Sequence, residues 1–596
     1  MTFDQTSLFL VLGGVFAFFI WGRWRYDVVA FAALMVSVLI GIIPSESAFL
    51  GFSHPAVITV AAVLVISRGL AVSGAVERIA HIVVPPIKNL TMQIGIMAGF
   101  SAILSAVMNN VAALALLMPS TIESAKKSGR SPALLLMPLS FGSILGGLIT
   151  LIGTPPNIVI GNYRNDALGA PYSMFDFAPV GLVVALVGVV YLAFVGWRLL
   201  PKERQAQSAP DELFNIDDYI AEVIVPEGSE AVGQRVSDLD TIADSCDVRI
   251  AGLIRNHQRI LRTTRATIVQ EKDIILLEAG PKELDVFAHK LGLEIKGDFE
   301  KDRGLFSSED VVLVEAVVSP DSRIVKRESG ALRLKSRYGL NLLGLSRQGR
   351  TIRNRLHKII FQSGDILLLQ GDADSIADTL AGLKLLPLAE RGFQIGKRSQ
   401  AWIAAGLLAG AVTLAATGFF GLTISLALAA FGMVIFSVVP LRDLYDSIDW
   451  PVIVLVAAMI PIGGALETTG ATDLIVTSIL NLSAGYSPVV VLAILFIVTM
   501  TLSDLMNNVA TAVMMAPIGI SLARALEANP DSFLMAVAVG ASCAFLTPIG
   551  HKNNALIMGP GGYKFGDYWR MGLPLEILIV VVALPMILWV WPLYPS

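Results

Sequence analysis

Apolar residues dominate the beginning and the end of the chain, where they form long runs separated by short polar stretches. A helix needs about 20 mostly apolar residues to cross the roughly 30 Å hydrocarbon layer of a bilayer. Runs near this length lie at 7–22, 27–43, 56–74, 133–161, 175–197, 401–417, 420–439, 451–467, 533–558 and 573–592. Most of the charged residues fall between them, at 201–398. The pattern predicts membrane blocks at 1–200 and 399–596 around a soluble insert.

Two further apolar runs, 92–119 and 488–518, are interrupted midway by polar residues. Asn109 and Asn110 interrupt the first run, whereas Asn507 and Asn508 interrupt the second. Non-helical backbone inside hydrocarbon is tolerated only where protein, water or a ligand satisfies its polar groups. We therefore expect two re-entrant hairpins whose polar tips lie inside the membrane.

The two membrane blocks resemble each other in sequence. SAVMNNVA at 105–112 matches SDLMNNVA at 503–510, and the segment 176–182 resembles 567–573. The runs 133–161 and 533–558 also correspond, and each contains a predicted helix break, GTPPN at 153–157 and TPIGHKNN at 547–554. The fold class expected is an α-helical polytopic membrane protein with internal repeats.

Basic residues indicate how the helices cross the membrane, because Lys and Arg are enriched on the cytoplasmic side. One side of the layout holds Arg23, Arg25, Arg78, Lys88, Lys126, Lys127, Arg130, Arg198, Lys397, Arg398, Arg442, Lys564 and Arg570. The other side holds little beyond Arg164 and Arg524. This places residues 200–398 in the cytoplasm and the chain in the inner (plasma) membrane. The helix from Pro55 then runs inward and that from Pro451 outward, so the repeats are inverted, as in many secondary transporters.

Composition narrows the class further. Of the 596 residues, 54% are hydrophobic and 15% are charged. Soluble globular domains have roughly 25% charged residues. The formal net charge of -4 gives no reason to expect nucleic acid as a partner. No Walker-type phosphate loop and no potassium-channel filter motif occurs, which argues against an ATP-driven pump and a potassium channel. We expect no enzymatic activity.

The soluble insert is a tandem repeat. GLIR at 252–255 matches GLSR at 344–347, and DIILL at 273–277 matches DILLL at 365–369. Alternating apolar residues predict strands here, and a helix is expected from Pro281. We expect two small α+β domains, at 211–296 and 305–390.

The four predicted breaks are the candidate site. Freed backbone carbonyls suit Na⁺, whereas Asn amides and the positive ends of half-helices suit an anion. The predicted substrate-binding residues are Asn109, Asn110, Val111, Thr154, Pro155, Asn157, Asn507, Asn508, Val509, His551, Lys552, Asn553 and Asn554.

Several of these positions allow more than one interpretation. Ser105 and Ser503 share a helix face with the tips, so each hydroxyl either adds an ion ligand or bonds back to its own helix. Lys552 either adds positive charge to an anion site or extends to the cytoplasmic interface. Asp504 binds a cation, carries a proton, or pairs with Lys552.

At these residues the chain resembles the divalent-anion:sodium symporter family of the ion transporter superfamily. That family carries Ser-Asn-Thr at its hairpin tips and Gly-Thr-Pro-Pro-Asn at a broken helix. Residues 153–157 match the second motif fully, whereas the tips read Asn-Asn-Val and keep the central Asn. The resemblance implies a homodimer with an elevator mechanism and Na⁺ as coupling ion. The residues expected to bind Na⁺ are Ser105, Asn110, Gly153, Ser503, Asp504, Asn508, Thr547 and Gly550.

The insert resembles paired TrkA C-terminal domains, also called regulator-of-potassium-conductance C-terminal domains. This resemblance implies a nucleotide or another small ligand, unless the insert serves only for dimerisation. With His551 and Lys552 in its second break, the membrane part looks more like the branch linked to sulfate. We therefore expect Na⁺-coupled uptake of a small divalent anion such as sulfate. Alternatives are a C4-dicarboxylate:Na⁺ symporter, an exporter of arsenite or a sulfur amino acid, and a ligand-gated ion channel.

Overall fold

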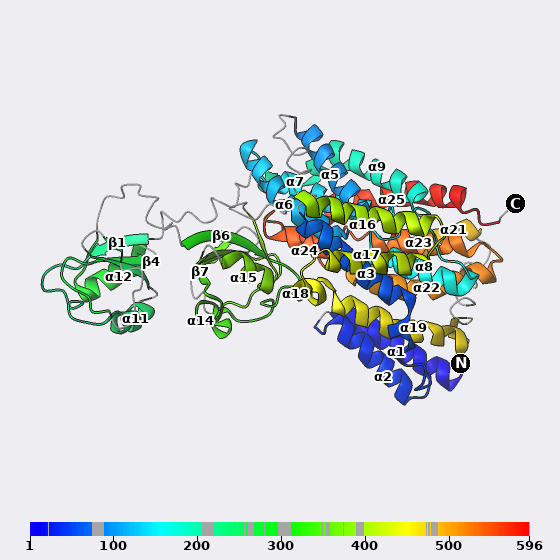
Figure 1. Cartoon of the computed structure of the whole chain (residues 1–596), viewed down its shortest axis with the longest axis horizontal. Helices are drawn as coiled ribbons and strands as arrows, with labels where there is room; N and C mark the ends of the chain where they lie inside the picture. Colours follow the sequence, from blue (N-terminus) through cyan, green and yellow to red (C-terminus); the bar gives the residue numbers. More distant parts are fainter. Residues whose placement is uncertain are drawn as a thin grey trace. The chain divides into compact units, whose positions relative to one another are not determined.

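The computed structural model describes most of the chain in two compact units, Met1–Ala209 with Leu386–Ser596, and Pro210–Leu385 (Figure 1). The residues it does not describe are 22, 74–88, 206–219, 247, 256–257, 260–266, 279–280, 296–310, 348–349, 353–357, 373–374, 389–397, 473, 475–476, 478–486 and 595–596. Arg78, Lys88 and Lys397, used above to predict orientation, lie outside the described residues.

The first unit consists mainly of helices. Its N-terminal half contains α1 (Phe3–Trp21), α2 (Tyr26–Leu39), η1 (Leu50–Ser53), α3 (Pro55–Val72), α5 (Leu90–Val107), α6 (Asn110–Lys127), α7 (Ala133–Gly146), α8 (Pro155–Leu168), α9 (Ala178–Phe194), η2 (Gly196–Leu199) and α10 (Lys202–Gln205). Its C-terminal half contains α16 (Arg398–Ala416), α17 (Leu422–Ile435), α18 (Leu441–Leu444), η7 (Tyr445–Ser447), α19 (Trp450–Thr468), α21 (Pro488–Leu505), α22 (Asn508–Ala525), α23 (Pro530–Ser542), α24 (Lys552–Met558), η8 (Phe565–Asp567) and α25 (Tyr568–Val590).

Several of these helices have the length and composition of membrane spans. Within the described residues, four are long and apolar enough to cross a bilayer, namely Pro55–Val72, Pro488–Leu505, Asn508–Ala525 and Phe565–Val590. Shorter apolar helices accompany them, among them α7, α9 and α17. A mostly helical unit with this many apolar helices agrees with a polytopic membrane protein.

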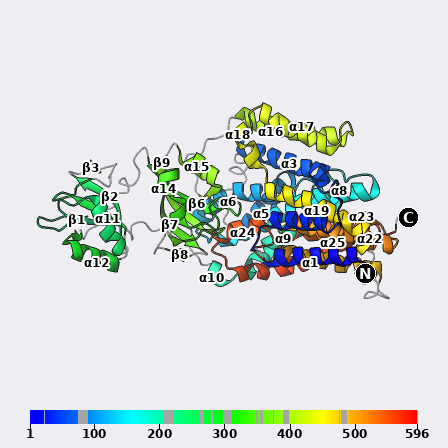
Figure 2. The same cartoon turned by 90° about the horizontal axis from the view of Figure 1, so that it is seen from below.

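Helices from both halves pack together in this unit. α8 lies against α22 and α23, and α25 lies against α9. α16, α17 and α3 lie side by side in both views (Figure 2). α5 and α7 approach so closely that a Cβ on Gly146 would lie 2.1 Å from the Ala102 carbonyl oxygen, so only glycine fits there.

The helices are interrupted where the sequence predicts breaks. α5 ends at Val107, Met108 is extended (φ −141°, ψ 165°), and α6 begins at Asn110. α21 and α22 repeat this geometry, with Met506 extended (φ −141°, ψ 175°) between them. Non-helical segments also separate α7 from α8 and α23 from α24.

The second unit contains two antiparallel sheets of five strands each, with the same topology. The first module has β1 (Ile220–Ile224), α11 (Val236–Ser245), β2 (Arg249–Arg255), β3 (Gln258–Arg259), β4 (Ile274–Glu278), α12 (Pro281–Leu291) and β5 (Glu294–Ile295). The second has β6 (Val311–Val318), α13 (Ser329–Leu332), α14 (Leu334–Tyr338), β7 (Asn341–Arg347), β8 (Arg350–Ile352), β9 (Ile366–Asp372), α15 (Ile376–Leu383) and β10 (Leu385–Pro387). The strand order in the first module is β3-β2-β4-β1-β5. In the second module the equivalent order is β8-β7-β9-β6-β10.

A buried ion pair recurs in the two modules. The guanidinium of Arg255 donates to both carboxylate oxygens of Asp273 at 2.8 and 2.7 Å, and Arg347 does the same to Asp365 at 2.7 and 2.8 Å. The hydrogen bond to Asp273 raises the pKa of Arg255. Each aspartate also accepts from a backbone N–H three residues earlier, so it fixes the turn that leads into its strand.

Candidate ion and substrate site

The first break carries a buried polar cluster around Asn110. Asn110 is 3% exposed, and its Oδ1 accepts a 2.6 Å hydrogen bond from the Ser105 hydroxyl. Asn109 acts differently, because its Oδ1 accepts from the Val111 N–H and so caps α6. Ser105 therefore bonds to the tip and not back to its own helix.

Ser143 and two residues of the second half, His551 and Asn553, complete this cluster. The Asn110 carbonyl accepts from Ser143 of α7 at 2.8 Å and from the Asn553 amide at 3.2 Å. The Asn553 amide also donates to the Ser143 hydroxyl at 3.0 Å. His551 Nε2 lies 3.3 Å from Asn110 Nδ2. The first tip and the second broken segment thus meet inside the protein.

Asn157 and Asn554 brace the two broken segments in the same way. Asn157 Nδ2 donates to the carbonyls of Gly147 and Thr150, ten and seven residues earlier. Asn554 Nδ2 donates to the carbonyls of Ala544 and Thr547, at the same spacings of ten and seven. Each side chain therefore binds carbonyls of the non-helical segment that follows the preceding helix.

Gly153 and Gly550 also occupy equivalent places, and both permit close backbone contact. A Cβ on Gly153 would lie 2.6 Å from the Gly147 carbonyl oxygen, and one on Gly550 would lie 2.6 Å from that of Ser503. No side chain fits at these separations. The lack of a side chain therefore lets the first broken segment pack against itself at Gly153 and the second pack against α21 at Gly550.

At the second tip the polar groups are arranged differently. Ser503 donates to the Ala541 carbonyl and so does not bond back to its own helix. Asp504 is 2% exposed, and its Oδ1 accepts from the Leu546 N–H at 2.9 Å. Its backbone carbonyl accepts from the Thr547 hydroxyl at 2.6 Å. Asn508 is only partly buried, and its Oδ1 accepts from the Val509 N–H.

Four buried oxygen atoms around the breaks have no hydrogen-bond partner among the described residues. They are Thr154 Oγ1, Asn157 Oδ1, Asp504 Oδ2 and Asn553 Oδ1. Unsatisfied buried acceptors are uncommon in native proteins and indicate a water, an ion or a ligand. Oxygen ligands suit hard cations such as Na⁺, so the residues present fit the expected coupling ion.

Lys552 forms an ion pair at the start of α24. Its ammonium pairs with Asp449, and the two side chains are 22% and 21% exposed. Of the three alternatives for Asp504, the pair with Lys552 does not occur among the described ion pairs. Pro155 begins α8, where its missing N–H costs nothing, and Val111 and Val509 contribute backbone N–H groups to the caps of Asn109 and Asn507.

Sequence reasoning missed several residues that contact the site. Ser140 donates to Asn554 Oδ1 at 2.9 Å, Ser143 links Asn110 to Asn553, and Thr150 donates to the Ala106 carbonyl. Ser140 and Ser143 lie one turn apart in an otherwise apolar helix, and this spacing was an available signal. Glu576 of α25 was also missed, and its Oε1 accepts from the Phe545 N–H at 3.2 Å.

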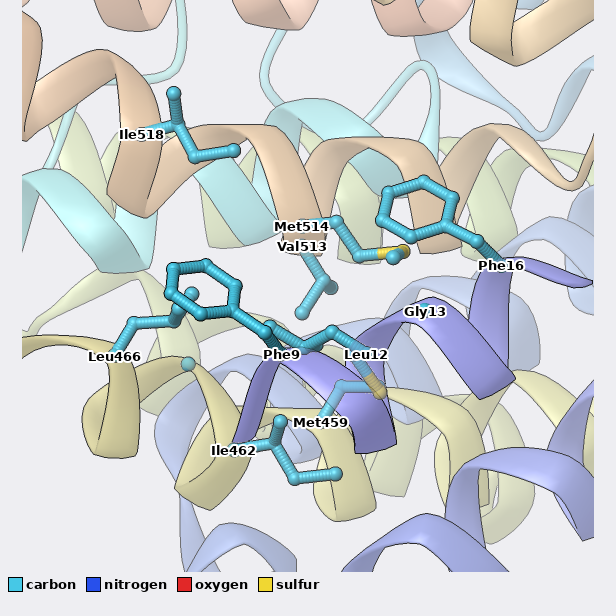
Figure 3. Close-up of a pocket in the computed structure, with 11 residues that line it drawn as sticks. Phe9, Leu12, Gly13, Phe16, Met459, Ile462, Leu466, Val513, Met514 and Ile518 are labelled. Carbon is cyan, nitrogen blue, oxygen red and sulfur yellow. The ribbon is translucent and has the colours of Figure 1, made fainter. Parts of the chain in front are cut away.

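The pocket in Figure 3 is a different feature. It lies between α1, α19 and α22, and apolar side chains such as Phe9, Met459 and Met514 line it. None of the predicted site residues lines it. Its chemistry suits an apolar group and not an anion.

Comparison with known proteins gives the family. A citrate transporter model (CitMHS) matches residues 16–531 and 495–596. An uncharacterized transporter of Synechocystis is 28% identical over 581 residues, 96% of this chain and 94% of that protein. A putative sulfur deprivation response regulator of Chlamydomonas reinhardtii is 26% identical over 584 residues, 94% of this chain and 97% of that protein.

Shorter matches include proteins named for their substrates. Sodium/sulfate cotransporter 2 of C. reinhardtii is 25% identical over 325 residues, 53% of this chain and 37% of that protein. A sodium-dependent dicarboxylate transporter of Staphylococcus saprophyticus is 26% identical over 150 residues, 25% of this chain and 29% of that protein. Since the family model spans most of the sequence, the chain belongs to the citrate transporter (CitMHS) family.

Proposed function

We propose that this protein is a secondary active transporter that takes up sulfate together with Na⁺. The observation that carries the proposal is the set of unpartnered buried oxygens, on Thr154, Asn157, Asp504 and Asn553, at the helix breaks within the described part of the chain. A bound cation satisfies such oxygens, and an inward Na⁺ gradient then supplies the energy for uptake. The names of the relatives that cotransport sodium support the choice of Na⁺.

Sulfate suits the neutral donors of this site. Asn110 and His551 place an amide and an imidazole nitrogen in one buried cluster, and serine hydroxyls lie beside them. An arginine would favour a planar carboxylate through paired hydrogen bonds. The described hydrogen bonds of this cluster include none from an arginine, and Lys552 is paired with Asp449.

A C4-dicarboxylate is the second candidate. The family description, citrate transporter, and the dicarboxylate transporter among the relatives favour a carboxylate substrate. The Asn-Asn-Val tips weigh against it, because Val111 and Val509 replace a threonine hydroxyl of the resembling family.

We further propose an elevator mechanism in a homodimer of inverted repeats, with two re-entrant hairpins in the moving part. α6 and α7 pack with α24, and α8 packs with α22 and α23, so the breaks travel together if this group moves. The modules at 211–296 and 305–390 are then cytoplasmic TrkA-C-like domains. A nucleotide or other small ligand there biases transport only if it binds the inward and outward states with different affinity.

Uptake into liposomes tests the proposal. Purified protein is reconstituted, an inward Na⁺ gradient is imposed, and entry of labelled sulfate, succinate and citrate is compared with that in choline medium. We expect sulfate entry that depends on the gradient and saturates. Gradient-driven succinate or citrate entry without sulfate entry would reassign the substrate, and failure of all three would refute Na⁺-coupled uptake.

A further inference from the structure

The apolar pocket of Figure 3 is a space that the described side chains leave unfilled. Its volume is about 250 Å³, and its lining comes from α1, α19 and α22. α19 packs on both of the other helices. All three helices have the apolar composition of membrane spans. The pocket therefore lies in the part of the unit that we expect inside the bilayer.

Gly13 forms an entrance to this pocket. Phe9 and Phe16 lie four residues before and three residues after it, on the same face of α1. Gly13 is exposed, and a Cβ there would meet no other part of the described chain within 4 Å. Packing explains the other glycine of the lining, because a Cβ on Gly463 would lie 2.5 Å from the Tyr163 hydroxyl oxygen. Gly13 instead leaves a gap between two rings.

The far side of the pocket is buried. Its inner wall consists of Met459, Ile462 and Val513, whose side chains are 1%, 0% and 1% exposed. The surface of α1 outside the entrance is apolar as well, with Leu10 72% and Phe18 42% exposed. Exposed apolar surface of this kind is typical of contact with a membrane. The pocket therefore extends from a surface suited to lipid into the interior of the unit.

The lining selects an apolar occupant. Every lining residue has an apolar side chain or is glycine, and a buried water needs two to four polar partners. Inside a bilayer the hydrophobic effect does not distinguish the pocket from its surroundings, because lipid tails are as apolar as leucine. Unfilled space still costs energy, since the atoms that line it lose dispersion contacts. A narrow alkyl chain restores these contacts, and the flexible Met459 adapts to it.

We propose that this pocket binds one acyl chain of a membrane phospholipid, which enters beside Gly13 and reaches the inner wall. Acyl chains surround the entrance at this depth of the bilayer, and they are thin and flexible enough to pass between the rings of Phe9 and Phe16. α19 packs with α2 and η1, whereas α22 packs with α8 and α23, so the bound chain lies between two groups of helices. The inference depends neither on the substrate nor on Na⁺ coupling.

Photolabelling in liposomes tests this site. The full-length protein is reconstituted in phosphatidylcholine that carries a diazirine in the middle of one acyl chain, and the labelled residues are mapped by mass spectrometry after illumination. Lipid that only surrounds the protein should label exposed residues such as Leu10. A chain in the pocket should also label the inner wall, which that surrounding lipid does not reach. Labelling of Leu10 without the inner wall would overturn the site, whether the pocket is empty or covered by a second copy of the chain.

Two glycine variants test the entrance. Gly13→Leu places a side chain in the gap, so it should abolish labelling of the inner wall and leave that of Leu10 unchanged. Gly14→Leu is the matched control, because a Cβ there also meets no other described part of the chain within 4 Å and Gly14 does not line the pocket. Both changes raise helix propensity equally. The control should be labelled like the wild type.

Three results would contradict the proposal. Folded Gly13→Leu protein with an inner wall labelled like that of the wild type would overturn the entrance and the site with it. Equal loss of inner-wall labelling in Gly14→Leu would show that the effect is not specific to the pocket. Labelling by a diazirine fatty acid added to ordinary liposomes, with none by the phospholipid, would overturn the choice of occupant. The wild-type pattern decides by itself if Gly13→Leu fails to fold.

Discussion

The two broken segments of the first unit have the same backbone arrangement, but they differ in the charged side chains that bind them. Both are braced by an asparagine amide at the same spacings, and both have a threonine hydroxyl bonded to the preceding tip helix, Thr150 to Ala106 and Thr547 to Asp504. Only the second segment has its amides bound by carboxylates among the described hydrogen bonds. The shared groups are those that hold a helix break open in an apolar interior.

The shared braces give the largest expected effect. Asn157→Ala removes two side-chain hydrogen bonds, and Asn554→Ala removes three, because Ser140 also donates to Asn554 Oδ1. Each carbonyl left unpaired costs roughly 1–3 kcal/mol. Both variants should lower the free energy of unfolding and abolish uptake, as measured by denaturant titration and liposome flux. Loss of stability and uptake in one variant, with wild-type behaviour in the other, would show that the two segments are not equivalent.

The tips provide the next comparison. Asn110→Ala and Asn508→Ala should each abolish uptake in a protein that remains folded. Asn110 should cost more stability, because it bonds within the buried cluster, whereas Asn508 is partly exposed. Flux and thermal unfolding measured together separate the two effects. Wild-type transport in both variants would refute the assignment of the tips to the site.

The soluble modules allow a similar comparison away from the membrane. Asp273→Asn and Asp365→Asn each remove the partner of an arginine at an aspartate whose side chain is 1% exposed. Breaking a buried pair by removing one partner costs roughly 3–5 kcal/mol, less where the arginine is partly exposed, as here. Hydrogen exchange of β4 or β9 should rise only in the altered module. Equal rises in both modules would show that they do not unfold independently.

The smallest effect is expected at Lys552. The pair that it forms with Asp449 is partly exposed. Such pairs contribute roughly 0–1 kcal/mol. Lys552→Met should therefore change stability little and leave the KM for sulfate within about twofold if the lysine does not bind the anion. A large rise in KM with unchanged folding would place Lys552 in the anion site after all.

The sequence predicted the positions of the breaks because polar asparagine pairs interrupt the apolar runs there. Its local identities also indicated which positions of the two halves correspond. It could not predict that His551 and Asn553 meet Asn110, because that contact depends on how helices distant in sequence pack. The same reason explains why the sequence did not indicate Asp449 as the partner of Lys552, since the two residues lie 103 positions apart. Glu576 escaped notice because its apolar neighbours dominate the pattern of α25.

A density map of the protein in a lipid nanodisc, with Na⁺ and sulfate present, tests the central claim most directly. The account predicts that the four helix breaks lie at the depth of the hydrocarbon layer. It also predicts density for ions or solute in contact with Asn157 Oδ1, Asn553 Oδ1 and Asp504 Oδ2. Breaks that face bulk water beyond the lipid, or bound density that touches none of these oxygens, would contradict it.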